Sequence, residues 1–133
     1  RKAFVRAPLS FTRISSDFNP RRRHPILNTI RAHQGVDYSA PKGTPVKASG
    51  DGKIIFRGWK GGYGNTIILQ HGGNVTTLYG HLSRFGVMNG QQVNRGDVIG
   101  FVGSTGRSTS SHLHYEIWVN GKLTNPMRLL AAR

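Results

Sequence analysis

Apolar and polar residues alternate most clearly near the end of the chain, between His112 and Val119. A β-strand repeats its side-chain direction every two residues, so alternation places one set of side chains on each face. The odd positions are apolar or aromatic: Leu113, Tyr115, Ile117 and Val119. The even positions are His112, His114, Glu116 and Trp118. We therefore predict a strand whose odd face packs in a core and whose even face carries chemistry.

Short β-branched and aromatic runs recur from residue 44 onward, separated by turn signals such as Gly72-Gly73-Asn74 and Asn120-Gly121. They predict further strands at residues 44–48, 52–57, 65–70, 75–81, 91–93 and 98–102. The 18 glycines suit many tight turns. We predict a mainly β fold, with antiparallel sheets that form a groove, β-hammerhead-like segments and at most a short C-terminal helix capped by Asn125.

The two ends of the chain suggest one domain with an extension. Residues 1–30 are rich in basic side chains and show no clear periodicity, so we expect a basic N-terminal arm and loops that pack on the domain. Residues 31–133 are expected to form that domain, because the chain is long enough for one hydrophobic core but not for two.

Histidine and aspartate are spaced in a way that suits a metal site. His33 and Asp37 would share one face of a strand, and so would His112 and His114. Two strands can therefore offer three imidazoles and a carboxylate to one pocket. Catalytic Zn²⁺ sites accept such nitrogen and oxygen ligands, normally three of them, and keep a fourth position open for water. The spacing alone leaves open which of these residues are ligands.

Amide hydrolysis at zinc also needs a group that handles the proton. The motif His-Glu-x-x-His, which supplies a glutamate base, does not occur in this chain. Once three ligands are assigned, His112 and His81 remain near the site strings. An imidazole of near-neutral pKa can exchange a proton with water or donate to a developing oxyanion.

Composition adds limits on partners and compartment. The formal charge of +14 comes from 19 Lys and Arg against five Asp and Glu, which predicts attraction to nucleic acid, anionic lipid or an acidic wall polymer but no particular fold. The lack of cysteine excludes disulfides and thiolate metal sites. No apolar run is long enough for a membrane span, and no signal-like stretch opens the chain, so we expect a mature piece of a longer exported precursor.

Three motifs occur in the order found in lysostaphin-type (LytM-type) zinc metallopeptidases: His33-x-x-x-Asp37, Tyr79-Gly80-His81-Leu82 and His112-Leu113-His114. The chain resembles this family over nearly its whole length from Ile14 onward. Two strings look most like those of Gram-negative murein DD-endopeptidases: Phe18-Asn19-Pro20-Arg21-Arg22 and His112-Leu113-His114-Tyr115-Glu116-Ile117-Trp118.

The resemblance implies specific roles. His33, Asp37 and His114 would bind one Zn²⁺, while His81 and His112 would polarise the attacking zinc-bound water and stabilise the tetrahedral intermediate. The implied reaction is hydrolysis of peptidoglycan peptide cross-links, specifically the bond from D-alanine to meso-diaminopimelate, in the periplasm or cell envelope. Some relatives are catalytically silent and regulate other wall hydrolases, which is the alternative function. Further expected partners are a regulatory protein or an inhibitory pro-segment, because in latent members an upstream segment supplies a fourth ligand.

Other residues near the site strings have weaker assignments. Tyr63, Asn65 and Arg107 are candidates for substrate binding. Turn stabilisation explains Tyr63 and Asn65 about as well, and Arg107 begins a polar loop that is either a groove wall or an ordinary connection. Glu116 lies on the same strand face as His114 and is either an acceptor that orients this ligand or an ordinary salt-bridge partner.

Two other classes of protein share features with this chain. Gly50-Asp51-Gly52 and Gly96-Asp97 resemble the β-hammerhead of biotinyl and lipoyl carrier domains, but no exposed lysine stands in a tight hairpin with recognition residues. The charge and aromatic residues such as Trp59 suit a nucleic-acid binder. Neither class would need one bound zinc per chain, so zinc content separates them from the hydrolase, and we expect no nucleic-acid partner.

Overall fold

The computed structural model describes Pro8 and residues 13–16, 19–24, 29–33, 35–108 and 110–125; side chains are described for Pro8, 35–108 and 110–125. The C-terminal helix predicted after Asn125 lies outside the described residues. Within the described part of the chain, no helix has the length and apolar character needed to span a membrane.

Strands account for most of the described residues, and the helical element among them is the short 3-10 helix η2, Gly61–Tyr63. The strands are β1 Arg13–Ser16, β2 Asn19–His24, β3 Thr29–His33, β4 Val36–Ser39, β5 Pro45–Lys47, β6 Gly52–Trp59, β7 Asn65–Gly72, β8 Val75–Phe85, β9 Gln92–Val93, β10 Val98–Val102, β11 His112–Val119 and β12 Lys122–Thr124.

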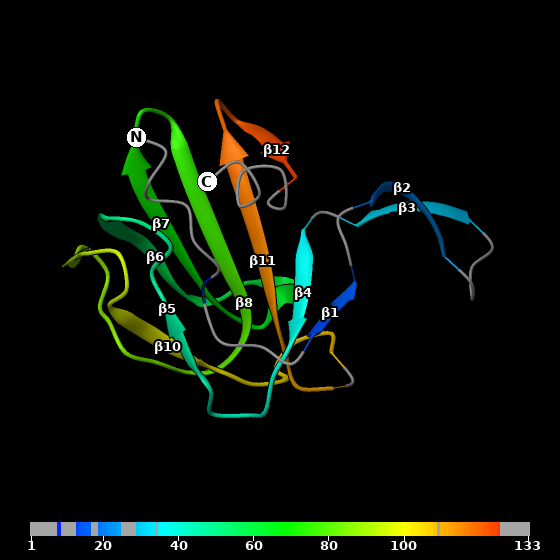
Figure 1. The fold of residues 1–133 in the computed structure, drawn as a ribbon, viewed down its shortest axis with the longest axis horizontal. Coiled ribbons are helices and arrows are strands. Elements are labelled where there is room, and N and C mark those ends of the chain that lie inside the picture. Colours follow the sequence, from blue (N-terminus) through cyan, green and yellow to red (C-terminus); the bar gives the residue numbers. More distant parts are fainter. Residues whose placement is uncertain are drawn as a thin grey trace.

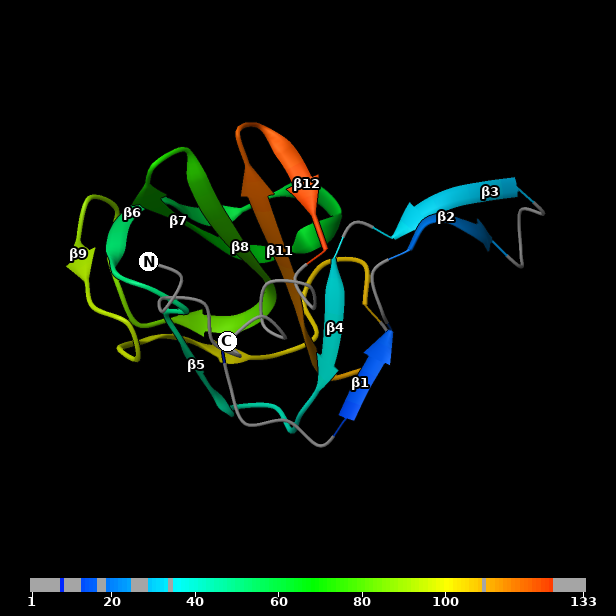
Figure 2. The same ribbon diagram turned by 45° about the horizontal axis from the view of Figure 1, so that its top comes forward.

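One large antiparallel sheet organises the molecule. Its main path runs β1-β4-β11-β8-β7-β6-β9, while β5 and β10 pair with each other, β10 also pairs with β8, and β12 pairs with β11 (Figure 1). The β2–β3 hairpin forms a separate sheet that projects from the side of β4 and β1 (Figure 2). The predicted mainly β, antiparallel fold is confirmed, and each strand predicted from residue 44 onward is present.

Two hairpin turns follow directly from the sequence. Gly73 and Asn74 join β7 to β8 with φ of 60° and 64°, and Asn120 and Gly121 join β11 to β12 with φ of 55° and 76°. Two consecutive residues with positive φ are typical of the type I′ turns that match the twist of paired strands, and they favour Asn and Gly.

The core lies on the odd face of β11. Leu113, Tyr115 and Ile117 are completely buried and belong to one cluster with residues of β4, β7, β8 and β10. The predicted division of the two faces is therefore confirmed, with one addition. Glu116 on the even face is also completely buried, so this side chain is enclosed by neighbours and is not at the surface.

Strands occur within the first 30 residues of the chain. Residues 1–30 were expected to be arm and loops, but β1 pairs with β4 in the main sheet and β2 pairs with β3. A strand at a sheet edge is held mainly by backbone hydrogen bonds, so it does not need alternating apolar residues. The domain boundary at residue 30 stays a prediction.

His33 and Asp37 were expected on one strand, but β3 ends at His33 and β4 begins at Val36. The chain passes through Gly35 between them, where a Cβ atom would overlap the carbonyl oxygen of Tyr115. The close approach of this backbone to β11 requires glycine and separates the two strands.

Candidate active site

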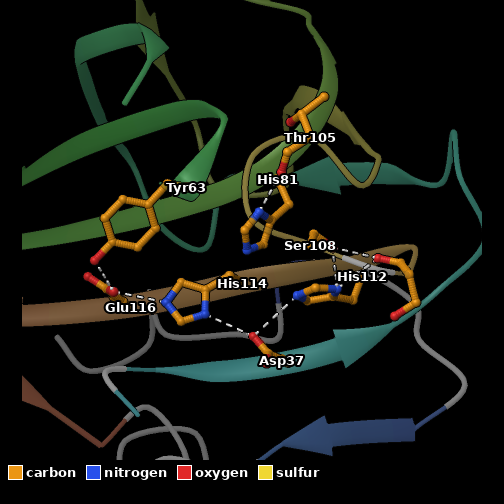
Figure 3. A network of polar contacts seen from close by, with 9 residues as sticks. Asp37, Tyr63, His81, Thr105, Ser108, His112, His114 and Glu116 are labelled. Carbon is orange, nitrogen blue, oxygen red and sulfur yellow. Dashed lines mark hydrogen bonds and ion pairs between the residues drawn. The ribbon is translucent and has the colours of Figure 1, made fainter. Parts of the chain in front are cut away.

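Neighbouring strands bring the even face of β11 together with β4 and β8. Asp37 of β4 pairs with His114 of β11, and Gly80 of β8 pairs with His114 on the other side. Directly paired residues in an antiparallel sheet point to the same face. The side chains of Asp37, His112 and His114 therefore meet above one face of the sheet, as Figure 3 shows.

His81 reaches the same face through an irregularity in β8. Asn65 pairs with Leu82 and Ile67 with Tyr79, so β8 contains one extra residue here, a β-bulge. His81 adopts φ of 61°, which is uncommon for a residue other than glycine and is often found at functional sites. The His81 ring centroid lies 4.8 Å from that of His112 and 6.0 Å from that of His114.

Backbone carbonyls orient both histidines predicted to handle protons. Nδ1 of His81 donates to the carbonyl of Thr105 at 2.7 Å, and Nδ1 of His112 donates to the carbonyl of Ser110 at 2.9 Å. Because a carbonyl oxygen can only accept, the proton of each neutral ring is on Nδ1 and the basic nitrogen is Nε2. Burial lowers the pKa of His81 below its usual 6.5, against the opposing hydrogen bond to Thr105. His81 is therefore a neutral base at pH 7.

Asp37 stands between the two histidines of β11. Its Oδ1 atom lies 2.8 Å from Nδ1 of His114 and 3.7 Å from Nε2 of His112. Burial lowers the pKa of His114, but hydrogen bonds with Asp37 and Glu116 more than reverse this effect and raise the pKa to about 9. Nδ1 of His114 and the Asp37 carboxylate thus face each other at close range.

Glu116 is enclosed by three donors. Its Oε2 atom accepts from Nε2 of His114 at 2.9 Å and from the hydroxyl of Tyr63 at 2.6 Å, while Oε1 accepts from Nε1 of Trp118 at 2.8 Å. Burial tends to raise the pKa of Glu116, but hydrogen bonds from His114 and Tyr63 outweigh it and the pKa is lowered. Glu116 is therefore a buried carboxylate in its charged form, and not the surface salt-bridge partner that the sequence left open.

The three residues predicted to bind substrate differ in their hydrogen bonds and in their exposure to solvent. The Tyr63 hydroxyl is engaged with Glu116, and the side-chain amide of Asn65 donates to the carbonyl of Leu82 at 3.1 Å. Arg107 is exposed. Substrate binding by these residues stays a prediction, and Arg107 is the member whose side chain is open to solvent.

Two loops at the site interlock through glycines. An added Cβ on Gly106 would overlap the backbone nitrogen of Gly64 and lie 2.6 Å from the carbonyl of Gly62. A Cβ on Gly64 would lie 2.5 Å from the carbonyl carbon of Thr105. The N–H of Arg107 donates to Gly62 at 2.8 Å. The loop that holds Thr105 and the loop that holds Tyr63 are thus packed backbone to backbone.

The described side chains of the site include ligand types that suit zinc. Asp37 and His114 supply one carboxylate oxygen and one imidazole nitrogen, which are ligand types of catalytic zinc. The backbone of His33 ends β3, but its side chain lies outside the described residues. Among the side chains that are described, no group of three or more could hold a metal ion, and His33 as the third ligand stays a prediction.

Comparison with known proteins then identifies the family. The model for "Peptidase family M23" matches residues 31–126, which is more than half of the chain. The chain belongs to peptidase family M23. The lysostaphin-type metallopeptidase family expected from the motifs is therefore confirmed.

Similar proteins come from Neisseria and Vibrio. The chain is 59% identical over 120 residues to the DD-carboxypeptidase/endopeptidase Mpg of Neisseria meningitidis serogroup B, covering 90% of this chain and 27% of Mpg. It is 48% identical over 126 residues to the peptidoglycan DD-endopeptidase ShyC of Vibrio cholerae, covering 95% of this chain and 29% of ShyC. The chain thus spans less than a third of the length of these relatives.

A solved structure, a zinc containing peptidase from Vibrio cholerae, has the same fold. It superposes with a TM-score of 0.90 at 38% identity, covering 94% of this chain and 39% of that one.

Proposed function

We propose that this M23 domain is a zinc-dependent endopeptidase that hydrolyses peptidoglycan peptide cross-links at the bond from D-alanine to meso-diaminopimelate, in the periplasm or cell envelope. The convergence of Asp37, His81, His112 and His114 from three strands of one sheet carries this proposal. The name of ShyC, a peptidoglycan DD-endopeptidase, supports the substrate class.

In this proposal His33, Asp37 and His114 hold the metal. A bound zinc would supply a Lewis acid and lower the pKa of a bound water. The ring of His114 is fixed on both sides, by Asp37 at Nδ1 and by Glu116 at Nε2. Asp37 reaches both His112 and His114, so the ligand set and the proton-handling histidines share one polar cluster.

His81 and His112 handle the protons. Each ring is anchored through Nδ1 to a backbone carbonyl, so Nε2 can take a proton from the attacking water. The same Nε2 can then return it to the amine that leaves, or donate to the oxygen of the attacked carbonyl. Two anchored bases favour an active hydrolase over the alternative of a silent wall-binding regulator.

Charge and surface residues suit an acidic substrate. The formal charge of +14 raises the encounter rate with an anionic wall polymer at low salt. Arg107 is exposed and adjoins Gly62 in the loop that carries Tyr63, and its guanidinium can pair with a carboxylate of the stem peptide.

The test is digestion of purified cross-linked muropeptide dimers, followed by mass spectrometry. We expect monomers produced by cleavage between D-alanine and meso-diaminopimelate. A chelator should abolish cleavage, and added zinc should restore it. An Asp37→Asn sample, prepared in parallel, controls for a contaminating hydrolase. A zinc-loaded chain that leaves the dimers intact would support the regulator instead, and cleavage at another bond would overturn the proposed specificity.

A further inference from the structure

We propose that Glu116 is a positioning residue, which fixes the orientation and the tautomer of His114 so that Nδ1 faces Asp37 and the metal. This inference rests on the proposed role of His114 as a ligand. Its basis is geometric: Oε2 of Glu116 lies 2.9 Å from Nε2 of His114, on the opposite side of the ring from Asp37.

The direction of this hydrogen bond decides the tautomer. Tyr63 and Trp118 donate to the two oxygens of Glu116, so Oε2 faces Nε2 of His114 as an acceptor and the proton of this hydrogen bond lies on Nε2. With that proton on Nε2, the lone pair of the neutral ring is on Nδ1, the nitrogen that faces Asp37. Metal-binding histidines in proteins commonly donate their second N–H to such a carboxylate, which holds the ring and increases its basicity.

Glu116 is itself held rigidly. The hydroxyl of Tyr63 and the indole N–H of Trp118 both donate to it, and the Tyr63 ring packs 5.5 Å from the His114 ring. Behind it, Gly35 leaves no room for a side chain, because a Cβ there would lie 2.9 Å from Cγ of Glu116. These contacts hold the carboxylate in place, and Figure 3 shows it between the Tyr63 hydroxyl and the His114 ring.

Zinc affinity and NMR test this role without any measurement of turnover. Glu116→Ala should weaken zinc binding about 10- to 100-fold in competition with a chromophoric chelator. In ¹⁵N spectra of the zinc-loaded parent, His114 should show a protonated Nε2, and Glu116→Ala should lose this signal through exchange with water.

Glu116→Gln serves as the matched variant, because its amide oxygen can still accept from Nε2. It should lose less affinity than Glu116→Ala and keep the Nε2 proton signal. Parent-like zinc affinity in a folded Glu116→Ala, or equal losses in both variants, would overturn the positioning role. Intact zinc binding in a parent that cleaves no muropeptide would count against the proposed function only.

A different observation points to a second site. We infer that a pocket at the far end of the same sheet face binds a sugar of the glycan strand. The pocket has a volume of about 520 Å³ and is lined by Gln70, Asn74, Thr76, Trp118, Asn120 and Gly121. Thr76 pairs with both Gln70 and Trp118, so these three side chains share the sheet face of Glu116 and His114.

The lining has the chemistry of a carbohydrate site. It contains no charged side chain, although the chain carries 19 Lys and Arg. Amides and a hydroxyl both donate and accept, as the paired hydroxyls of a sugar require, and the indole of Trp118 offers an apolar surface to the C–H face of a pyranose ring. The stem peptide bears carboxylates and would find no cation here.

Spacing along β11 fits the proposed substrate. Trp118 follows His114 by four residues, which is about 14 Å at about 3.4 Å per residue. An extended peptide of four residues spans about 14 Å, so a glycan that carries a stem peptide of this length can occupy the pocket while the far end of the peptide reaches the metal ligands. This second inference likewise rests on peptidoglycan as the substrate.

Binding of chitotriose, a soluble N-acetylglucosamine oligomer, tests the pocket. The indole N–H signal of Trp118 should shift saturably at millimolar ligand, whereas that of exposed Trp59 should not. The double variant Asn74→Gly and Asn120→Gly removes two lining amides, and glycine suits their positive φ of 64° and 55°. It should lose the shift and raise KM for a glycan-bearing dimer but not for a sugar-free peptide. An unmoved Trp118 signal, or equal KM effects on both substrates, would overturn the sugar site.

Discussion

Replacing His81 with alanine is expected to lower the turnover of cross-linked muropeptide by about 100- to 10,000-fold and to leave the zinc content unchanged. The reason is that His81 offers a basic Nε2 to the cluster while Nδ1 is held by Thr105. It is not among the proposed ligands. Steady-state kinetics together with metal analysis of the purified variant make the measurement.

The positive φ of His81 requires a second variant as a control for backbone strain. Alanine at φ of 61° keeps the left-handed strain, whereas asparagine tolerates this conformation and has no basic nitrogen. His81→Asn should therefore fold at least as well as His81→Ala and be equally inactive. Parent-level turnover in a folded His81→Asn protein would remove His81 from the proton-handling role.

Replacing Gly35 with alanine is expected to destabilise the fold by about 3 kcal/mol. The new methyl group would overlap the carbonyl oxygen of Tyr115, which is backbone and cannot rotate away, and would press on Glu116. β4 and β11 must separate to accept it, so zinc affinity should fall as well. Denaturant unfolding measures the first effect, and chelator competition measures the second.

Gly58→Ala is the matched control for Gly35→Ala. A Cβ on Gly58 would make only ordinary contact, 3.6 Å from Cζ of Phe56, so its free energy of unfolding should stay within about 1 kcal/mol of the parent value. If Gly35→Ala were as stable as Gly58→Ala, the backbone contact between Gly35 and β11 would not be a constraint in solution.

Local patterns in the sequence predict the strands of the sheet and the face of β11 that carries His112 and His114. Alternation from His112 to Val119 gives the correct strand and faces, because one side packs against a core and the other does not. The Asn-Gly and Gly-Asn pairs give the correct turns, since few residues adopt positive φ. The family motifs add His81, which no periodicity identifies.

The parts that escaped prediction depend on contacts between distant segments. β1 is an edge strand that gains its partner only when β4 is in place. Strict alternation from Gly80 puts His81 on the wrong face, and only the bulge opposite Asn65 and Ile67 corrects this. The acceptors for His81 and His112 are backbone carbonyls of Thr105 and Ser110. Every residue has a backbone carbonyl, so the residue type does not predict which one accepts.

The interlocked glycines have a consequence for engineering. The segment around Gly64 carries Tyr63, which supports Glu116, and the segment around Gly106 carries Thr105, which anchors His81. Since each backbone fits into space that a methyl group on the other would fill, a segment that lacks its glycine cannot replace one of the two alone. Chimaeras that exchange both segments as a unit should retain the catalytic architecture. Single exchanges should disturb both the support of Glu116 by Tyr63 and the anchor of His81 at Thr105.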